Sequence, residues 1–289
     1  MAILTMDIAS RAMGRRVTLN AFVPLEDIQK GDNLRLLLLL HGVKGSYANW
    51  MGITDMIMLV NRHNIRASQN GFSRLAVVMA SGGNGFYHPV PHKNDPSWKL
   101  PCGHVHDYEA FFGEELPETM RFLLPLSGRA EDTMIAGLSM GGYGALLLGM
   151  KHPGTFGRVG GFSSALVTRE SRAFLQNDGF YGREEFLSQI YGDFEEAKHS
   201  PAHDVQEVVH ALMQERGREN MPAIYLACGT EDPLLPLSRG LDAALTAMGV
   251  KHRYEEHEGA HEWAFWQWGL SRLLLSWNQD MEASSVKGT

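Results

Sequence analysis

Residues 133–149 read TMIAGLSMGGYGALLLG and place a serine between an apolar segment and a segment of small and leucine residues. Its first part, Thr133–Leu138, is apolar and predicts a buried strand, while the small and leucine residues at its end predict a helix. Gly137 and Gly141 lie two residues before and two residues after Ser139. A serine on so tight a strand-to-helix turn adopts a strained backbone, and neighbours at this spacing have no room for side chains. We therefore expect Ser139 on a surface turn at the end of a buried strand.

Further strands flank this stretch. Arg35–Leu40 and Leu75–Ala80 are continuously apolar, which is typical of strands that helices cover on both faces. Residues 224–228 and 253–256 give weaker strand signals later in the chain. Because helical patterns separate the strands, we predict an α/β protein whose central sheet is mostly parallel, with helices on both faces. The helical patterns cover residues 54–62, 108–124, 141–150, 237–248 and 263–277.

Three regions depart from this alternation. Residues 3–8 and 16–23 predict an antiparallel hairpin at the start of the chain. Between residues 165 and 222 short polar-rich helical patterns replace the strands, which indicates a helical insertion that lies over the strand ends as a partial cap. Residues 281–289 are small and polar, and we expect them to be frayed. A length of 289 residues fits one α/β domain, so we predict a single domain over residues 1–289.

Composition excludes several classes of protein. Apolar residues make up 44% of the chain, which is enough for a large core. With 26 basic and 33 acidic residues the net charge is −7, whereas a nucleic-acid binder needs a basic face. The continuous apolar runs, such as residues 36–40 and 75–80, are too short to cross a membrane. No signal-peptide pattern opens the chain, and two cysteines 126 positions apart indicate free thiols. We therefore expect a cytoplasmic protein that binds neither nucleic acid nor membrane.

A serine nucleophile needs a base and a group that orients the base. Loops after successive parallel strands meet at one edge of a sheet, so these partners should follow later strands. Asp232 follows the strand at 224–228, and His261 follows the strand at 253–256. The order Ser, Asp, His is that of the α/β-hydrolase arrangement. The alternatives are an ordinary glycine-rich turn without chemistry, or other partners for the serine: Glu231 as the acid, and His252 or His257 as the base.

Negative charge that develops on a substrate carbonyl oxygen needs backbone N–H donors. One expected donor is the amide of Met140, directly after the serine. The other should come from the loop after Arg35–Leu40, which reads HGVKG over residues 41–45. Gly42 permits a close approach to the substrate, and we choose the amide of Val43 as the second donor.

These stretches together resemble the esterase D-like branch of the α/β-hydrolase superfamily, and most of all the bacterial tributyrin esterases. Feruloyl esterases, S-formylglutathione hydrolases and mycolyltransferases are more distant relatives. The resemblance implies an α/β-hydrolase fold with Ser139 as nucleophile, His261 as base, Asp232 as its orienting group, and the Val43 and Met140 amides as oxyanion donors. The matching stretches are residues 16–20, the His41-Gly42 loop with Trp50, residues 84–87, 137–144, 229–232 and 261–266.

Three further residues are candidate substrate contacts. Lys44 is a candidate contact for an acidic group on the substrate, with a solvated surface lysine as the alternative. Trp263, next but one to His261, is a candidate for lining the acyl pocket, with a core-facing position on its helix as the alternative. The resemblance implies substrate contacts around Tyr87. The segment that follows, residues 88–103, is longer and richer in proline and histidine than the resemblance predicts.

The histidines near this segment raise the question of a metal site. Two of them, His88 and His92, are four residues apart, and three more candidate ligands follow: His104, His106 and Asp107. Prolines between His88 and His92 make a helix with both imidazoles on one side implausible. We therefore expect neither a metal nor any other cofactor.

The combined pattern predicts a serine carboxylesterase that hydrolyses short-chain acyl esters of small molecules through an acyl-enzyme. An insertion of short polar helices offers little apolar wall for a longer acyl chain. The alternatives are a thioester hydrolase of the S-formylglutathione type, a feruloyl or acetyl carbohydrate esterase, an acyltransferase, and a non-catalytic binding protein on the same scaffold. The oligomeric state stays open, and a homo-oligomer is compatible with the sequence.

Overall fold

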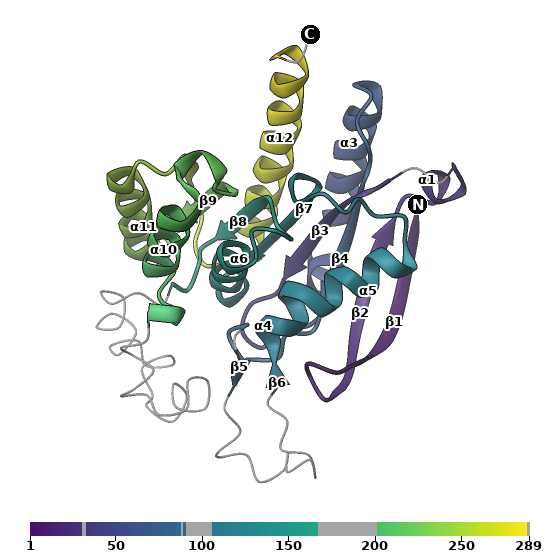
Figure 1. Cartoon of the computed structure of the whole chain (residues 1–289), viewed down its shortest axis with the longest axis horizontal. Coiled ribbons are helices and arrows are strands. Elements are labelled where there is room, and N and C mark those ends of the chain that lie inside the picture. The colour runs from purple at the N-terminus through teal and green to yellow at the C-terminus, as the bar shows by residue number, and fades with distance from the viewer. Residues whose placement is uncertain (31–32, 88, 91–105, 167–200, 288–289) are drawn as a thin grey trace.

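A mostly parallel sheet of eight strands forms the centre of the molecule in the computed structural model, which describes residues 1–30, 33–87, 89–90, 106–166 and 201–287 (Figure 1). The strand order is β1-β2-β4-β3-β7-β8-β9-β10. β1 and β2 form the predicted antiparallel hairpin, and every pairing from β4 to β10 is parallel. The strands are β1 (Ala2–Ser10), β2 (Arg15–Val23), β3 (Arg35–Leu40), β4 (Leu75–Ala80), β7 (Thr133–Leu138), β8 (Arg158–Phe162), β9 (Ala223–Gly229) and β10 (His252–His257).

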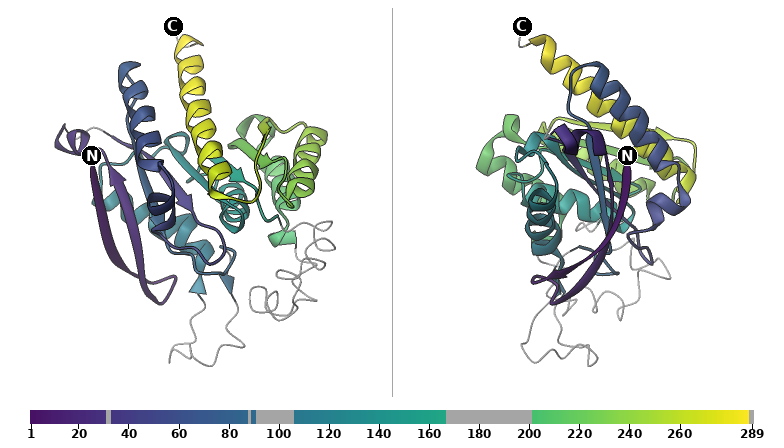
Figure 2. Two further views of the ribbon diagram at one scale, coloured as in Figure 1. Left: turned by 180° about the vertical axis from the view of Figure 1, so that it is seen from behind. Right: turned by 90° about the vertical axis from the view of Figure 1, so that its right-hand side faces the viewer.

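Helices cover both faces of this sheet, as the sequence predicts. α3 (Met56–Gln69) and α12 (Trp263–Lys287) lie on one face, and α5 (Leu116–Leu123) and α6 (Met140–Lys151) lie on the other (Figure 2). The architecture is therefore the predicted α/β-hydrolase fold. The remaining elements are α1 (Leu25–Lys30), α2 (Asn49–Ile53), α4 (Tyr108–Ala110), η3 (Phe111–Glu115), η4 (Ala130–Asp132), η5 (Pro201–His203), α10 (Val205–Arg216), η6 (Arg218–Asn220), α11 (Leu235–Met248) and the antiparallel pair β5 (Pro89–Val90) and β6 (His106–Asp107).

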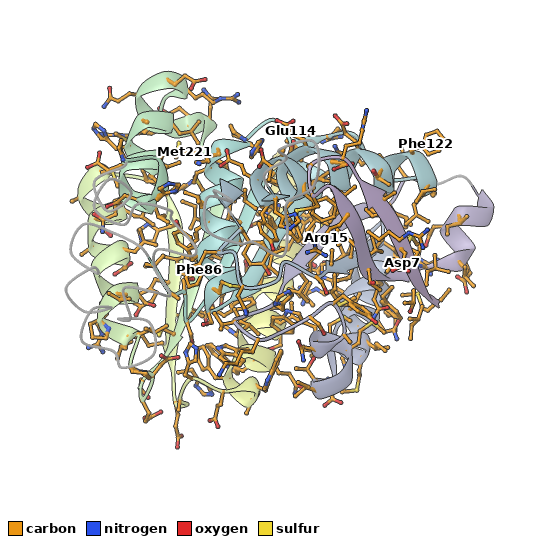
Figure 3. The ribbon with its side chains drawn as sticks, turned by 90° about the horizontal axis from the view of Figure 1, so that it is seen from below. Asp7, Arg15, Phe86, Glu114, Phe122 and Met221 are labelled. Carbon is orange, nitrogen blue, oxygen red and sulfur yellow. The ribbon has the colours of Figure 1, made fainter. Side chains whose placement is uncertain are left out.

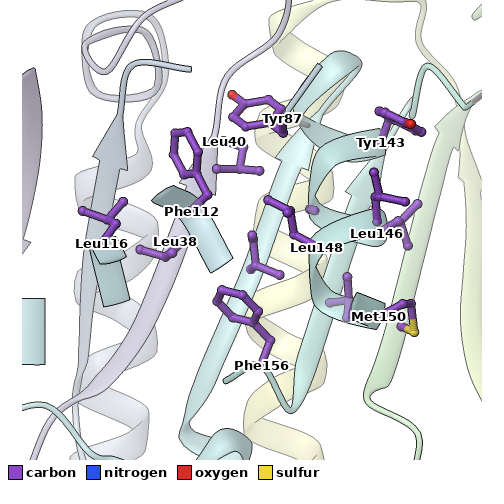
Figure 4. Close-up of a cluster of buried hydrophobic side chains, with 14 of the residues drawn as sticks. Leu38, Leu40, Tyr87, Phe112, Leu116, Tyr143, Leu146, Leu148, Met150 and Phe156 are labelled. Atoms are coloured by element: carbon purple, nitrogen blue, oxygen red, sulfur yellow. The ribbon is translucent and has the colours of Figure 1, made fainter. Parts of the chain in front are cut away.

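The side chains of β3 show why its sequence is continuously apolar. Leu36, Leu38 and Leu40 enter the core under α5 and α6, whereas Leu37 and Leu39 enter the core under α3 and α12. Successive residues of a strand point to opposite faces, so a strand with helices on both sides needs apolar residues throughout. Figure 4 shows the first of these cores, in which Leu38 and Leu40 lie beside aromatic rings and the leucines of α6.

Two parts of the chain differ from the sequence prediction. β8 reads RVGGF and was not predicted as a strand, because its two glycines weaken the apolar pattern. It is nevertheless buried between β7 and β9 and pairs with both. α12 continues to Lys287, where fraying was expected from residue 281. Glu282 on this last part of α12 accepts two hydrogen bonds of 2.9 Å from Arg66 on α3, and these bonds hold the end of α12 against α3.

The predicted insertion at 165–222 is described only over its second part. There α10 packs against α6 and α11, and its buried residues Val205, Val209 and Leu212 join the core above the sheet face. Residues 167–200 lie outside the described part of the chain, so the partial cap and the single-domain organisation stay predictions. Among the described residues, no helix combines the length and apolarity needed to cross a membrane.

Candidate active site

The turn between β7 and α6 holds Ser139 in the strained conformation that the sequence predicts. Its φ is 53° and its ψ is −119°, a conformation that residues other than glycine rarely adopt. A Cβ on Gly137 would lie 2.5 Å from the carbonyl oxygen of Gly141, and a Cβ on Gly141 would lie 2.6 Å from that of His41. Both glycines are therefore required by backbone crowding around the serine.

The structure brings Ser139, His261 and Asp232 into one line of hydrogen bonds. Nε2 of His261 lies 3.0 Å from Oγ of Ser139, and Nδ1 lies 2.9 Å and 3.2 Å from the two carboxylate oxygens of Asp232. β9 and β10 are parallel neighbours, so the loops that follow them run side by side. Backbone hydrogen bonds from Thr230 to His257 (2.9 Å) and from Glu231 to Gly259 (3.1 Å) join these two loops.

The carboxylate of Asp232 is shielded from solvent, since its side chain is 0% exposed. It also accepts a 2.8 Å hydrogen bond from the amide of Leu234. Burial would raise the pKa of this carboxyl, but hydrogen bonding and charge attraction from His261 outweigh burial and hold the pKa below its ordinary value. Asp232 is therefore an anion at neutral pH, aimed at the imidazole ring.

The alternative partners of the serine are engaged elsewhere. Glu231 accepts hydrogen bonds from the Gly259 amide (2.5 Å) and the Thr230 hydroxyl (2.6 Å), so it braces the histidine loop. His252 contacts Asp242 at 2.8 Å. His257 stacks on Trp268 with ring centroids 4.4 Å apart. These contacts favour Asp232 and His261 over the alternatives.

A pocket of about 400 Å³ opens beside Ser139 at the edge of the sheet where the parallel strands end. Figure 3 looks onto this edge, with Phe86, in the loop after β4, near the middle of the view. The predicted Val43, Lys44 and Trp263 all line the pocket, whereas Met140 opens α6 next to it and is buried. The full lining is Gly42, Val43, Lys44, Gly45, Asn49, Leu138, Ser139, His261, Trp263 and Trp266.

The structure corrects the expectation for Tyr87. Its side chain is fully buried, and its hydroxyl donates a 2.9 Å hydrogen bond to the carbonyl oxygen of His41. The ring packs edge-on against Phe112 with centroids 5.0 Å apart, next to Leu40 (Figure 4). Burial raises the pKa of the phenol well above its ordinary value, so the hydroxyl stays protonated and donates. Tyr87 supports the loop after β3 from inside the protein and does not line the pocket.

Trp266 also lines the pocket, although it was not among the predicted substrate contacts. Its ring meets His261 edge-on at 5.0 Å and Trp263 edge-on at 5.2 Å. Trp263 in turn meets the buried Trp50 at 5.5 Å. Edge-to-face packing of this kind holds the histidine ring in place. The signal that could have found Trp266 is its spacing of three residues from Trp263, which places both on one face of a helix.

The described histidine near the proline-rich segment has a structural partner. Nδ1 of His106 lies 2.6 Å from the carbonyl oxygen of Met13, and Asp107 accepts a 2.8 Å hydrogen bond from the amide of Ala110 at the start of α4. The described part of the chain holds no group of three histidine, cysteine or acidic side chains arranged for a metal. Three candidate ligands lie outside it: His88, His92 and His104. The metal-free expectation therefore stays a prediction.

Comparison with known proteins identifies the family. The model of the esterase family described as "Putative esterase" matches residues 10–276. The chain belongs to this esterase family. An acetyl esterase from Caldicellulosiruptor saccharolyticus is 31% identical to it over 274 residues, which cover 92% of this chain and 94% of that protein.

Solved structures agree on the fold of the esterase. The fluorophosphonate-binding serine hydrolase F of Staphylococcus aureus superposes with a TM-score of 0.77 at 20% identity, covering 96% of this chain and 98% of that one. The S-formylglutathione hydrolase of the same organism has a TM-score of 0.75 at 21% identity, with the same coverage of 96% and 98%. The predicted resemblance to esterases is confirmed at the family level, and the solved structures share the predicted fold. The esterase is a carboxylic ester hydrolase with a serine esterase function.

Proposed function

We propose that this esterase hydrolyses esters of short acyl chains through an acyl-enzyme formed on Ser139. The proposal rests on the hydrogen bonds that join Ser139 to His261 and His261 to Asp232. Ser139 and His261 line a small pocket. A serine hydroxyl is a weak nucleophile on its own, and a hydrogen-bonded imidazole oriented by a carboxylate activates it.

In the proposed first half of the reaction, Oγ of Ser139 attacks the ester carbonyl carbon while Nε2 of His261 takes the hydroxyl proton. The buried carboxylate of Asp232 holds the proton on Nδ1 and stabilises the imidazolium that forms. His261 then gives its proton to the departing alcohol, and the acyl group stays on the serine. In the second half, water attacks the acyl-enzyme while His261 takes a proton from it. His261 then returns this proton to Oγ of Ser139 as the bond to the acyl group breaks and the acid is released.

The negative charge on the carbonyl oxygen is proposed to rest on the amides of Val43 and Met140. Met140 is the first residue of α6, and the first amides of a helix have no partner within the helix. The positive end of the α6 dipole points the same way, which favours an anion at this position. Val43 lines the pocket on the loop after β3.

The size of the pocket supports the short acyl chain. About 400 Å³ has to hold both the acyl part and the alcohol part of an ester, and this lies near the lower end for small-molecule sites. A buried methylene contributes about 0.8 kcal/mol only where apolar surface receives it. Trp263 and Trp266 supply such a surface beside His261, but over a short length. The relative at 31% identity bears the name acetyl esterase, which supports a small acyl group.

The chemistry of the chain also supports small-molecule esters as substrates. Its net charge of −7 disfavours nucleic acid as a partner, and we propose that the enzyme works in the cytoplasm. A thioester leaving group, as in S-formylglutathione, would use the same three residues. The choice between an oxygen and a sulfur leaving group is therefore an outcome of the substrate test.

The test is kcat/KM for a series of p-nitrophenyl esters from acetate to laurate, with S-formylglutathione measured beside it. We expect a maximum at acetate or butyrate and a fall of at least about tenfold at octanoate, because the longer chain gains no apolar contact. A maximum at octanoate or longer would contradict the short-chain assignment. A much higher kcat/KM for S-formylglutathione would change the leaving group but keep Ser139 as nucleophile.

A further inference from the structure

The imidazole of His41 is buried at the carboxyl end of β3, just before the loop that carries Val43. Nδ1 of His41 lies 2.7 Å from the carbonyl oxygen of Gly42, and Nε2 lies 2.8 Å from the amide nitrogen of Gly82. A carbonyl only accepts and an amide N–H only donates, so the proton sits on Nδ1 and Nε2 is bare. Burial lowers the pKa of His41, partly offset by the bond to Gly42, and the ring is therefore neutral.

The carbonyl of Gly42 receives a second hydrogen bond, of 3.1 Å, from the amide of Gly45. Carbonyl and following N–H point in opposite directions in a planar trans peptide. Two donors that hold the Gly42 carbonyl therefore also set the direction of the Val43 N–H, which points away from the imidazole. Val43 lines the pocket beside Ser139, so this direction decides what the amide can meet.

The rest of the loop is fixed by bonds into the protein. The amide of Lys44 donates to the Asn84 side chain at 2.8 Å, and that of Tyr47 donates to the Ser81 hydroxyl at 3.2 Å. The amide of Ser46 donates to the side chain of Asn49. The amides after Val43 are thus used within the protein, which singles out Val43 as the oxyanion donor of this loop.

The position of the imidazole itself is tightly set. A Cβ on Gly45 would lie 2.8 Å from Nδ1 of His41, so a side chain there would displace the ring. The Tyr87 hydroxyl holds the His41 carbonyl, and the Trp50 indole donates a 2.9 Å hydrogen bond to the carbonyl of Leu40. Backbone and ring of His41 are therefore anchored independently of each other.

We propose that His41 is a positioning residue for ester hydrolysis: its imidazole turns the Gly42–Val43 peptide so that the Val43 amide faces the oxyanion. His41 acts through this peptide and not by contact with the substrate. The inference rests on the proposed function, because it requires an oxyanion to form next to Ser139.

Two substitutions separate this role from simple anchoring of the loop. His41→Asn keeps an N–H near the position of Nδ1 and loses the acceptor for Gly82, whereas His41→Gln keeps an acceptor near Nε2 and loses the donor to Gly42. We expect kcat to fall about 10- to 100-fold in the Gln variant with KM nearly unchanged, since an oxyanion donor typically contributes more than this when fully removed. The Asn variant should stay within about fivefold of wild type because it keeps the peptide in place.

A trifluoromethyl ketone that adds to Ser139 supplies the second readout, because its adduct carries an oxyanion. Its inhibition constant should rise by the same factor by which kcat/KM falls in the Gln variant. Equal losses in the Asn and Gln variants, or an unchanged inhibition constant, would overturn the role of His41. Ser139→Ala measured in parallel keeps the two claims apart: remaining hydrolysis there would overturn the proposed function, whereas its loss leaves only the His41 variants in question.

If both variants fail to fold, the wild-type protein still decides the question by nitrogen-15 NMR. We expect the His41 signals of an Nδ1–H tautomer, and a downfield shift of the Val43 amide proton when the ketone adduct forms. An Nε2–H tautomer, or a Val43 proton that does not shift, would overturn the proposal.

Discussion

The two ends of β3 each bury a basic side chain, yet they differ in what surrounds it. At the amino end, Arg35 donates a 2.7 Å hydrogen bond to the Ser73 carbonyl, lies 3.1 Å from Nε2 of His63, and covers the ring of Trp277 at 4.8 Å. These partners belong to α3, α12 and the turn before β4. At the carboxyl end, His41 contacts Gly42 in the loop after β3, which lines the pocket, and Gly82 in the loop after β4.

Charge distinguishes the two ends as well. Burial lowers the pKa of Arg35 to about 10, so the guanidinium is charged at neutral pH. Burial and the charge of Arg35 lower the pKa of His63 to about 3, so that ring is neutral. The buried cation of Arg35 contacts two helices and contributes to stability. The neutral ring of His41 contacts the loop that carries Val43 and contributes to the geometry of the site. Ligands of open α/β sheets bind beyond the carboxyl ends of the strands, which agrees with this division.

Ser139→Ala should have the largest effect on activity and almost none on stability. We expect the rate of ester hydrolysis to fall by about 10⁴- to 10⁶-fold, because the attacking oxygen is gone. The free energy of unfolding should stay within about 0.5 kcal/mol of wild type, since alanine can take the same backbone conformation at this turn. Steady-state kinetics and urea denaturation of the same preparation check both. Activity above a few per cent, with contamination excluded, would remove Ser139 from the site.

Asp232→Asn should come next, with a fall of about 10⁴-fold in kcat and an intact fold, because the amide favours the wrong tautomer of His261. Glu231→Gln is the matched control: its neighbouring carboxylate braces Gly259 and does not contact the imidazole. We expect a loss of less than about tenfold there, through a looser histidine loop. If Glu231→Gln abolishes hydrolysis while Asp232→Asn stays active, Glu231 and not Asp232 is the carboxylate that orients His261.

Arg35→Met tests the other end of β3. The free energy of unfolding should fall by about 2 to 4 kcal/mol, because His63 and the Ser73 carbonyl lose a buried donor. kcat should stay within about twofold of wild type, since Arg35 lies at the opposite end of the sheet from Ser139. Urea denaturation and ester kinetics measure the two quantities. A large loss of kcat in a variant that is still folded would show that the two ends are not independent.

His63→Gln should show the smallest effect on activity, and its effect on stability should change with pH. The folded-state pKa of His63 is about 3, far below the ordinary 6.5, so only the unfolded chain takes up a proton as the pH falls below 6.5. Acidification from pH 6.5 to 5 should therefore destabilise the wild type by about 1 kcal/mol per pH unit through this group. The Gln variant should show a flatter dependence in urea denaturation at pH 7.5, 6.5 and 5.5. If the free energy of unfolding changes equally with pH in both proteins, His63 takes up a proton in the folded protein as readily as in the unfolded chain.

The parts of the fold and site that could be predicted depend on local sequence. The apolar runs of β3, β4 and β7 and the crowded turn around Ser139 can be recognised from neighbouring residues alone. Asp232 and His261 could be predicted because each closely follows a predicted strand. The roles of Tyr87 and His41 could not be predicted, because they arise from contacts between residues 41, 82 and 87 that form only once the sheet has folded. β8 was missed for a related reason, since its strand character comes from its neighbours and not from its own glycine-rich sequence.

Covalent labelling shows whether Ser139 is the residue that forms the covalent intermediate. The wild-type enzyme is incubated with a fluorophosphonate ester, and the adduct is located by intact-protein and peptide mass spectrometry, with Ser139→Ala as control. We expect one adduct per chain, on the peptide that contains Ser139, and none on the alanine variant. An adduct on another residue of the wild type, or full labelling of Ser139→Ala, would contradict this expectation.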